Sequence, residues 1–249
     1  MNIKDWFLKK TEAFRAARAN VGYSCDVCGR EVFAYPKTRV CEKCLSRISF
    51  NDGLTCPLCG RKTLAAGLCL ACKSSPPAFD KGLSPLVYAR GVSSIINRLK
   101  NGQRHLCYFI ADECVRTLNA YMGTSLEEDP PVLIAVPMTK QKIEERGFNQ
   151  AEEIAKAVAQ KSGLSDLTGV LFKARETSPQ KDLSAKERRE NVSGAYRVKN
   201  REACKGKRVI LIDDVMTTSA TGNECAKVLK RAGAREVIFL TAASLKEQK

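Results

Sequence analysis

The chain has 249 residues, of which 44% are hydrophobic and 28% charged, and its formal net charge is +15 at pH 7. This length and composition favour a globular protein with one main domain and one smaller domain. They exclude an apolar membrane span, and the first ten residues carry charges where a signal peptide would have its apolar core. We therefore expect a cytoplasmic protein whose positive charge suits a polyanionic partner.

Residues 1–20 are expected to form a short helix, because Ile3, Phe7 and Phe14 recur on a rough helical stripe beside Trp6. A helix that packs on the rest of the protein is the favoured interpretation. A helix lying on a membrane surface is the alternative, although its apolar face is short.

Eight of the twelve cysteines form four Cys-x-x-Cys pairs, and the motif Cys-x-x-Cys-Gly-Arg occurs twice among them. Two such pairs supply four thiolates, which complete a tetrahedral zinc site and leave no position open for catalysis. Sequential pairing follows the repeat, a cross-braced arrangement stays open, and a reducing cytosol disfavours disulfides. We predict two structural zinc ions held by Cys25, Cys28, Cys41, Cys44, Cys56, Cys59, Cys69 and Cys72.

Beyond a linker at 74–77, apolar runs alternate with helical patterns. This alternation is typical of an α/β domain with a parallel sheet flanked by helices. A basic loop at 138–148 follows one expected strand, at the carboxyl end where α/β sheets bind ligands. The expected strands are 86–90, 132–136, 209–212 and 236–241, and the expected helices are 94–99, 149–162 and 222–231.

The strand at 209–212 is followed by the acid pair Asp213 and Asp214, then by the small residues 217–221 and a helix. Small residues between a strand and a helix N-terminus can bind a phosphate through N–H groups and hydroxyls. The adjacent carboxylates suit ribose hydroxyls or a bound Mg²⁺. A plain polar turn and an acid pair like that of response regulators are the alternatives.

Residues 209–221 resemble the phosphoribosyl pyrophosphate (PRPP) signature of type I phosphoribosyltransferases. The resemblance implies that Asp213 and Asp214 bind the ribose hydroxyls. Ser219 stands where that family usually has glycine, which weakens the fit if the position needs a positive φ angle. The residues that would bind the 5′-phosphate are Thr217, Thr218, Ser219, Ala220 and Thr221.

Three further features carry a closer resemblance: Val136-Pro137 with the motif at 146–151, the segment 176–196, and the cysteine pairs. Together they resemble the ComF/GntX family of competence-associated, phosphoribosyltransferase-like proteins. The resemblance implies a double zinc ribbon at 21–75 and a phosphoribosyltransferase-like domain at 80–249, which follow the expected helix at 1–20.

That family resemblance implies binding of PRPP with Mg²⁺ and of single-stranded DNA during natural transformation, alongside competence proteins such as a DNA helicase or translocase. The alternative is an active transferase that moves phosphoribose from PRPP to an unidentified base or amine. In such chemistry Mg²⁺ and basic side chains neutralise the leaving pyrophosphate. The candidate catalytic residues are Asp213, Asp214, Arg146 and Lys142.

Overall fold

The computed structural model describes residues 24–32, 39–177 and 184–247, so the expected helix at 1–20 lies outside the described part of the chain. Two compact units divide the chain, Met1–Arg47 and Ile48–Lys249. The first cysteine module belongs to the smaller unit. The second module shares the larger unit with the sheet, and its contacts there are described below.

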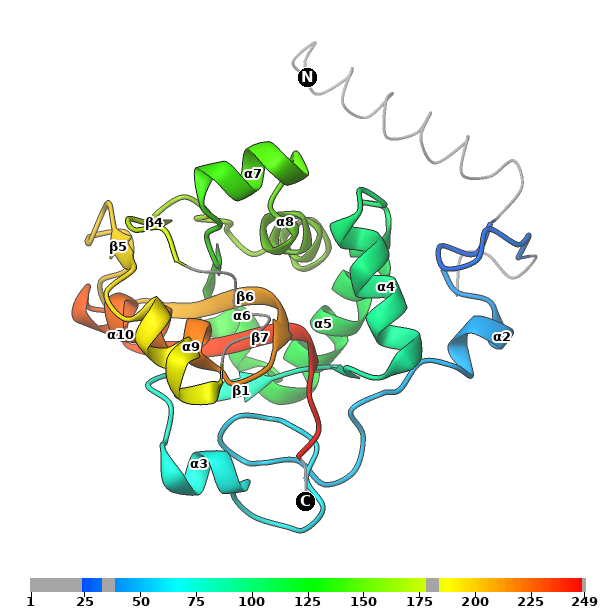
Figure 1. The fold of residues 1–249 in the computed structure, drawn as a ribbon, viewed down its shortest axis with the longest axis horizontal. Helices are drawn as coiled ribbons and strands as arrows, with labels where there is room; N and C mark the ends of the chain where they lie inside the picture. Colours follow the sequence, from blue (N-terminus) through cyan, green and yellow to red (C-terminus); the bar gives the residue numbers. More distant parts are fainter. Residues whose placement is uncertain (1–23, 33–38, 178–183, 248–249) are drawn as a thin grey trace. The chain divides into compact units, whose positions relative to one another are not determined.

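The larger unit is built on a five-stranded parallel sheet with the order β1-β7-β6-β3, in which β2 also pairs with β7 (Figure 1). In the two longest strands, six of the nine residues of β6 and eight of the nine residues of β7 are buried. The predicted parallel α/β sheet is thereby confirmed. The strands are β1 (Lys81–Leu83), β2 (Leu86–Val87), β3 (Val132–Ala135), β6 (Arg208–Met216) and β7 (Glu236–Ser244).

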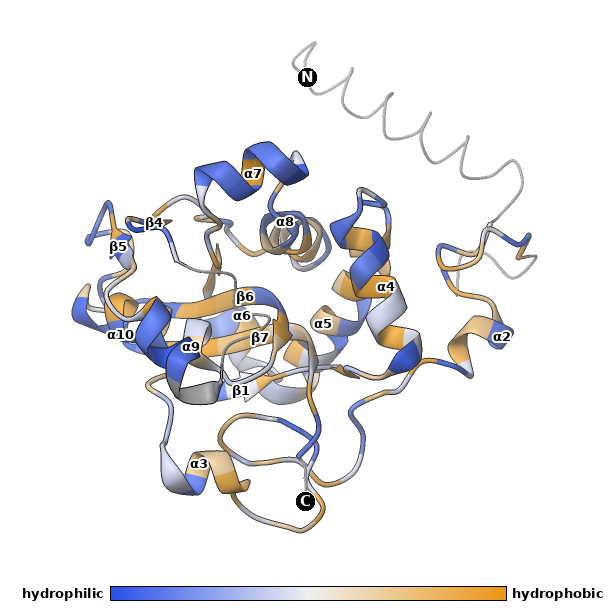
Figure 2. Ribbon diagram, viewed as in Figure 1, coloured by the Kyte–Doolittle hydropathy of each residue, from blue (hydrophilic) through white to orange (hydrophobic). Residues whose placement is uncertain are grey.

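Helices cover this sheet with their apolar sides, and polar residues lie on the outside (Figure 2). Helices α5 (Leu106–Met122) and α8 (Gln150–Ser162) pack on each other and on the sheet, whereas α10 (Ala220–Arg231) packs on β6 and β7. None of the described helices is both long and apolar enough to cross a membrane. The other helices are α2 (Glu42–Leu45), α3 (Leu70–Ser74), α4 (Arg90–Lys100), α6 (Ser125–Glu128), α7 (Lys140–Arg146) and α9 (Ala185–Val192), and β4 (Leu171–Lys173) pairs antiparallel with β5 (Tyr196–Val198).

Strand β6 is longer than the sequence suggested, because it continues through the acid pair to Met216. Its neighbour β7 is equally long and keeps pairing with it as far as Ser244. Its other neighbour, β3, stops at Ala135, opposite Ile212. Asp213 and Asp214 therefore follow the point at which β6 loses one neighbouring strand, which leaves room for a pocket beside them.

The expected basic loop at 138–148 contains helix α7. The hydroxyl of Thr139 accepts a hydrogen bond from the backbone N–H of Lys142 at 3.4 Å and caps its start, and Gly147 ends the helix with a φ of 83°. The next helix, α8, agrees with the prediction. Asn149 caps it by accepting a hydrogen bond from the N–H of Ala151 at 3.0 Å.

Candidate functional site

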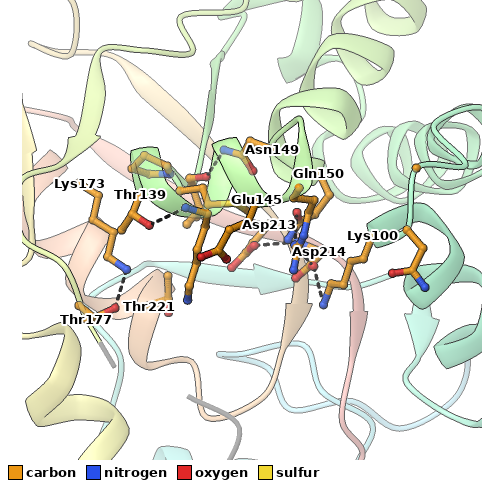
Figure 3. A pocket seen from close by; sticks show the side chains of 17 residues that line it. Lys100, Thr139, Glu145, Asn149, Gln150, Lys173, Thr177, Asp213, Asp214 and Thr221 are labelled. Carbon is orange, nitrogen blue, oxygen red and sulfur yellow. Dashed lines mark hydrogen bonds and ion pairs between the residues drawn. The ribbon is translucent and has the colours of Figure 1, made fainter. Parts of the chain in front are cut away.

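A pocket of about 730 Å³ opens at the carboxyl ends of β3 and β6 (Figure 3). A second cavity of about 380 Å³ follows residues 217–221, which we call the phosphate loop. Lys100, Asp213, Asp214 and Thr221 line both spaces, so the two form one continuous site. The structure thus places the acid pair and the loop residues beside the same spaces, and their binding of PRPP stays a prediction.

Asp214 is buried and its carboxylate is already fully engaged. One oxygen, Oδ2, accepts hydrogen bonds from Lys100 Nζ at 2.8 Å and from Gln150 Nε2 at 2.9 Å. The other, Oδ1, accepts a hydrogen bond from the N–H of Val215 at 2.6 Å. This network fixes the orientation of Asp214 and offsets the cost of burying its charge.

Asp213 is half-buried and lines both parts of the site. Its Oδ1 accepts a hydrogen bond from the N–H of Asp214 at 2.9 Å. Burial, and next the negative charge of Asp214, raise the pKa of Asp213 to about 8, although Lys100 acts in the opposite direction. A cation that binds here would favour the ionised carboxylate and release a proton.

Within the phosphate loop, Ser219 has a φ of 62° and is the residue before α10. Among the described residues it is the only one other than glycine with a positive φ. The position at which the PRPP signature predicts glycine therefore has the left-handed conformation in this structure, and serine adopts it at an energetic cost.

Lys142 and Arg146, the predicted basic candidates, line the larger pocket from α7. Arg146 Nη1 donates a hydrogen bond to Gln150 Oε1 at 2.6 Å, and Gln150 in turn donates to Asp214. Arg146 is thus connected to the acid pair through one amide side chain. Glu145 also lines the pocket and offsets part of this positive charge.

Lys100 and Lys173 are lining residues that the sequence analysis did not single out. Lys100 ends α4, and Lys173 ends β4 with its Nζ donating a hydrogen bond to the hydroxyl of Thr177 at 2.6 Å. Burial lowers the pKa of Lys173, and the nearby charge of Lys142 acts in the same direction. Neither lysine belongs to a recognisable local pattern, because tertiary packing brings both to the site.

The eight paired cysteines form two groups of four, and in each group the Sγ atoms all lie within 4.8 Å of one another. The Sγ atoms of Cys28 and Cys41 are 3.7 Å apart, as are those of Cys59 and Cys69. Zinc–sulfur bonds of about 2.3 Å in a tetrahedron require about 3.8 Å between sulfurs, so both groups fit zinc. A disulfide needs about 2.05 Å, which rules out the rival pairing here. The groups are sequential: Cys25, Cys28, Cys41 and Cys44 in one, and Cys56, Cys59, Cys69 and Cys72 in the other.

The two clusters share their local backbone but differ in exposure. In each repeat the first cysteine's N–H donates to the arginine carbonyl of the Cys-Gly-Arg motif: Cys25 to Arg30 at 2.6 Å and Cys56 to Arg61 at 2.9 Å. All four cysteines of the second cluster are buried, whereas Cys28 of the first is exposed. The second site is therefore the better protected of the two.

Comparison with known proteins agrees with this geometry. The family model described as "Phosphoribosyl transferase domain" matches residues 117–249, which is more than half of the chain. The chain therefore belongs to the phosphoribosyl transferase domain family.

Three relatives make the assignment narrower. The chain is 25% identical to Competence protein F of Haemophilus influenzae over 86% of each chain. It is 29% identical to DNA utilization protein YhgH of Escherichia coli O157:H7, over 68% of this chain and 74% of that protein. It is 27% identical to Competence protein ComFC of Bacillus subtilis, over 85% of this chain and 86% of that protein. Together with the domain match, these relatives place it among the ComF-family, phosphoribosyltransferase-like proteins.

Proposed function

We propose that this protein binds PRPP together with Mg²⁺ and handles single-stranded DNA during DNA uptake. The observation that carries the PRPP part is the continuous site formed by the acid pair and the phosphate loop. The DNA part is supported by the names of the competence and DNA utilization relatives and by the net charge of +15. With this role we propose a cytoplasmic location and partners such as a competence helicase or translocase.

The site suggests a division of labour among its residues. The N–H groups and hydroxyls of the phosphate loop, at the N-terminus of α10, would bind the 5′-phosphate. Asp213, whose carboxylate faces the pocket, is the better candidate for the ribose hydroxyls or Mg²⁺. Asp214 would reach the ribose only after Lys100 releases it. Lys142 and Arg146 would neutralise the pyrophosphate.

Two zinc ions, one in each cysteine cluster, would serve structure. Each would have four thiolate ligands and no open position, so the metal would supply folding energy and no chemistry.

The test is calorimetric titration of the zinc-loaded protein with PRPP, with and without Mg²⁺. Replacing both acids, Asp213→Asn and Asp214→Asn, should abolish Mg²⁺-dependent binding while keeping the hydrogen-bonding shape of the side chains. The protein that carries both Asp213→Ala and Asp214→Ala should lose Mg²⁺-dependent binding in the same way. A control variant, Asp112→Asn, replaces a partly exposed acid of α5 that pairs with Lys161 of α8 and lines neither cavity, so it should bind as the parent does. Unchanged affinity in both double variants would dismiss the assignment.

A second function, phosphoribosyl transfer, is supported by the size of the main pocket, about 730 Å³, which leaves space beside the acid pair for an acceptor. In that reaction the bond from the anomeric carbon to pyrophosphate breaks, and a bond to an acceptor nitrogen forms. Isotope-labelled PRPP offered with candidate bases and amines distinguishes the two functions. A labelled product with matching pyrophosphate release would establish transfer, whereas tight binding without product would favour a binding role.

A further inference from the structure

The second cysteine cluster makes direct contact with the phosphate loop. Arg61, which follows Cys59 and Gly60, donates a hydrogen bond from Nη2 to the carbonyl of Thr217 at 2.6 Å. A cavity of about 370 Å³ separates the cluster helix α3 from the loop and is lined on the loop side by Thr218 and Ser219. Because this cavity leaves the loop without close packing on that side, directed hydrogen bonds must hold it.

A second contact fastens the first turn of α10, just beyond the loop. The N–H of Ala78, just beyond the cluster, donates to Asn223 Oδ1 at 2.5 Å in the first turn of α10. Two of the four metal ligands, Cys69 and Cys72, lie between Arg61 and Ala78 in the sequence. The other two, Cys56 and Cys59, lie just before Arg61. Binding of a metal ion by this cluster fixes the chain from which both contacts come.

The backbone that presents Arg61 has little freedom. Gly60 has a φ of 70°, and a Cβ atom there would lie 2.2 Å from the carbonyl oxygen of Gly82 in β1. The N–H of Gly82 also donates to the carbonyl of Leu58 at 2.7 Å. The cysteine motif is thus packed against the edge of the sheet, and Arg61 leaves it in one direction. Its Nε is buried and has no described hydrogen-bond partner, so the loop contact is made through Nη2.

The loop is the part of the site that most needs such support. Ser219 adopts a left-handed backbone conformation that side chains other than glycine rarely adopt, and such strain persists only where the surroundings enforce it. We propose that Arg61 is a positioning residue: through the Thr217 carbonyl it couples metal occupancy of the second cysteine cluster to the loop's affinity for a phosphate group. This inference rests on the proposed PRPP site.

The test compares Arg61→Gln with Arg30→Gln. Arg30 occupies the same motif position in the first cluster, where it is exposed and where a Cβ on Gly29 would meet no atom within 4 Å. Both variants should keep two equivalents of zinc and the melting temperature of the parent within a few degrees. Arg61→Gln should weaken Mg²⁺-PRPP binding about tenfold, and Arg30→Gln should leave it unchanged. Arg61→Lys, which keeps one donor and the charge, should restore part of the affinity.

Reciprocal coupling gives a readout that a purely structural role would not move. With Co²⁺ in place of zinc, the thiolate-to-cobalt absorption bands should shift when PRPP binds the parent protein and stay constant in Arg61→Gln. If the parent does not bind PRPP, the proposed function and this inference both fail. If the parent binds and Arg61→Gln binds equally well, only the coupling is overturned. If Arg61→Gln loses its zinc, the comparison uses Arg61→Lys loaded with zinc instead. If that protein does not regain any PRPP affinity, the coupling is also overturned.

Discussion

Lys100 Nζ lies 2.8 Å from Asp214 Oδ2, and this ion pair makes the two adjacent acids of the site unlike each other. Asp214 is compensated by Lys100 and held in place, whereas burial and its charged neighbour raise the pKa of Asp213. The pair therefore presents one fixed carboxylate and one that can exchange a proton for a cation.

The first prediction concerns Lys100. Lys100→Met should lower the free energy of unfolding by about 2–3 kcal/mol, because it leaves the Asp214 carboxylate buried without its cation. Urea denaturation at pH 7 measures the change. Lys156→Met, which removes a largely exposed partner of Glu153, should change stability by less than about 1 kcal/mol. Equal effects of the two variants would show that the Lys100 pair is no more important than a surface pair.

The second prediction concerns pH. The pKa of Asp213 is about 8 in the folded protein and about 3.9 in an unfolded chain, so the folded state binds this proton more tightly. Its contribution to stability is complete below about pH 3.9, falls as pH rises from there, and is lost above about pH 8. Compared with Asp213→Asn, the parent should therefore lose stability between about pH 4 and pH 8 and show no further loss above that range.

Mg²⁺-PRPP binding should show the opposite trend, because the metal and ribose need the carboxylate. Affinity of the parent should rise roughly 20-fold between about pH 6.5 and 8.5, with release of close to one proton at about pH 6.5 and of about a quarter of one at about pH 8.5. Calorimetry in buffers of different ionisation enthalpy counts that proton. Titration of Mg²⁺-PRPP alone, without protein, serves as the control for protons that PRPP itself gains or loses. An affinity that did not change with pH, or a proton release no larger than PRPP alone accounts for, would contradict the assignment of the raised pKa.

The third prediction concerns the strained loop residue. Ser219→Gly should raise the free energy of unfolding by about 0.5–1 kcal/mol, since relief of the left-handed strain exceeds the entropy that glycine adds to the unfolded chain. It should also tighten PRPP binding. Ser219→Ala removes the same hydroxyl but keeps the Cβ, so it should bring no gain. If alanine stabilised as much as glycine, the hydroxyl and not the backbone would be responsible.

The fourth prediction concerns zinc. Metal analysis of reduced protein should find close to two equivalents, and a coloured chelator should remove them in two phases of one equivalent each. The first cluster should release its ion faster, because Cys28 is exposed whereas all four cysteines of the second cluster are buried. Cys28→Ser should abolish the fast phase and leave the slow one. A single common rate would show that exposure does not govern release.

The fifth prediction concerns single-stranded DNA. If lysines and arginines carry the binding, log affinity should fall linearly with log salt by about 0.7 for each phosphate contacted. Sequence preference should be weak, because only 6% of the residues are aromatic and stacking sites are scarce. Salt titration with a labelled oligonucleotide measures the slope.

Lys43 and Arg47, exposed in and just after α2, supply the variants for this experiment. Replacing both with glutamine should make the slope shallower if they contact phosphates, whereas Lys156→Gln on α8 should not change it. Absence of binding at low salt would refute the DNA proposal. A flat salt slope would refute its electrostatic basis.

The parallel sheet could be predicted because short apolar runs such as 209–212 indicate buried strands. The phosphate loop could be predicted because its small residues directly follow such a strand. The end of β6 was misplaced because adjacent carboxylates resemble a strand end, and only the length of β7 shows that pairing continues to Met216. Helix α7 was missed because its polar residues leave no apolar stripe, although its capping residues Thr139 and Gly147 were visible.

The site itself was predicted in part. The acid pair, phosphate loop, Lys142 and Arg146 could be named because local motifs contain them, and the structure brings all of them to one place. Lys100 could not be named, because its role depends on α4 ending beside Asp214. The same holds for the contact between Arg61 and Thr217, which lie far apart in the sequence.

The two copies of Cys-x-x-Cys-Gly-Arg, alike in their turns, stand in different surroundings. One ends in an exposed arginine, and the other is enclosed between β1 and the phosphate loop. In saturation mutagenesis the two equivalent arginines should therefore differ in their tolerance to substitution. Position 30 should accept most side chains, whereas position 61 should accept very few. Repeats in a sequence thus share a metal-binding turn without sharing a tolerance for change, and averaging over the copies would hide the position that matters.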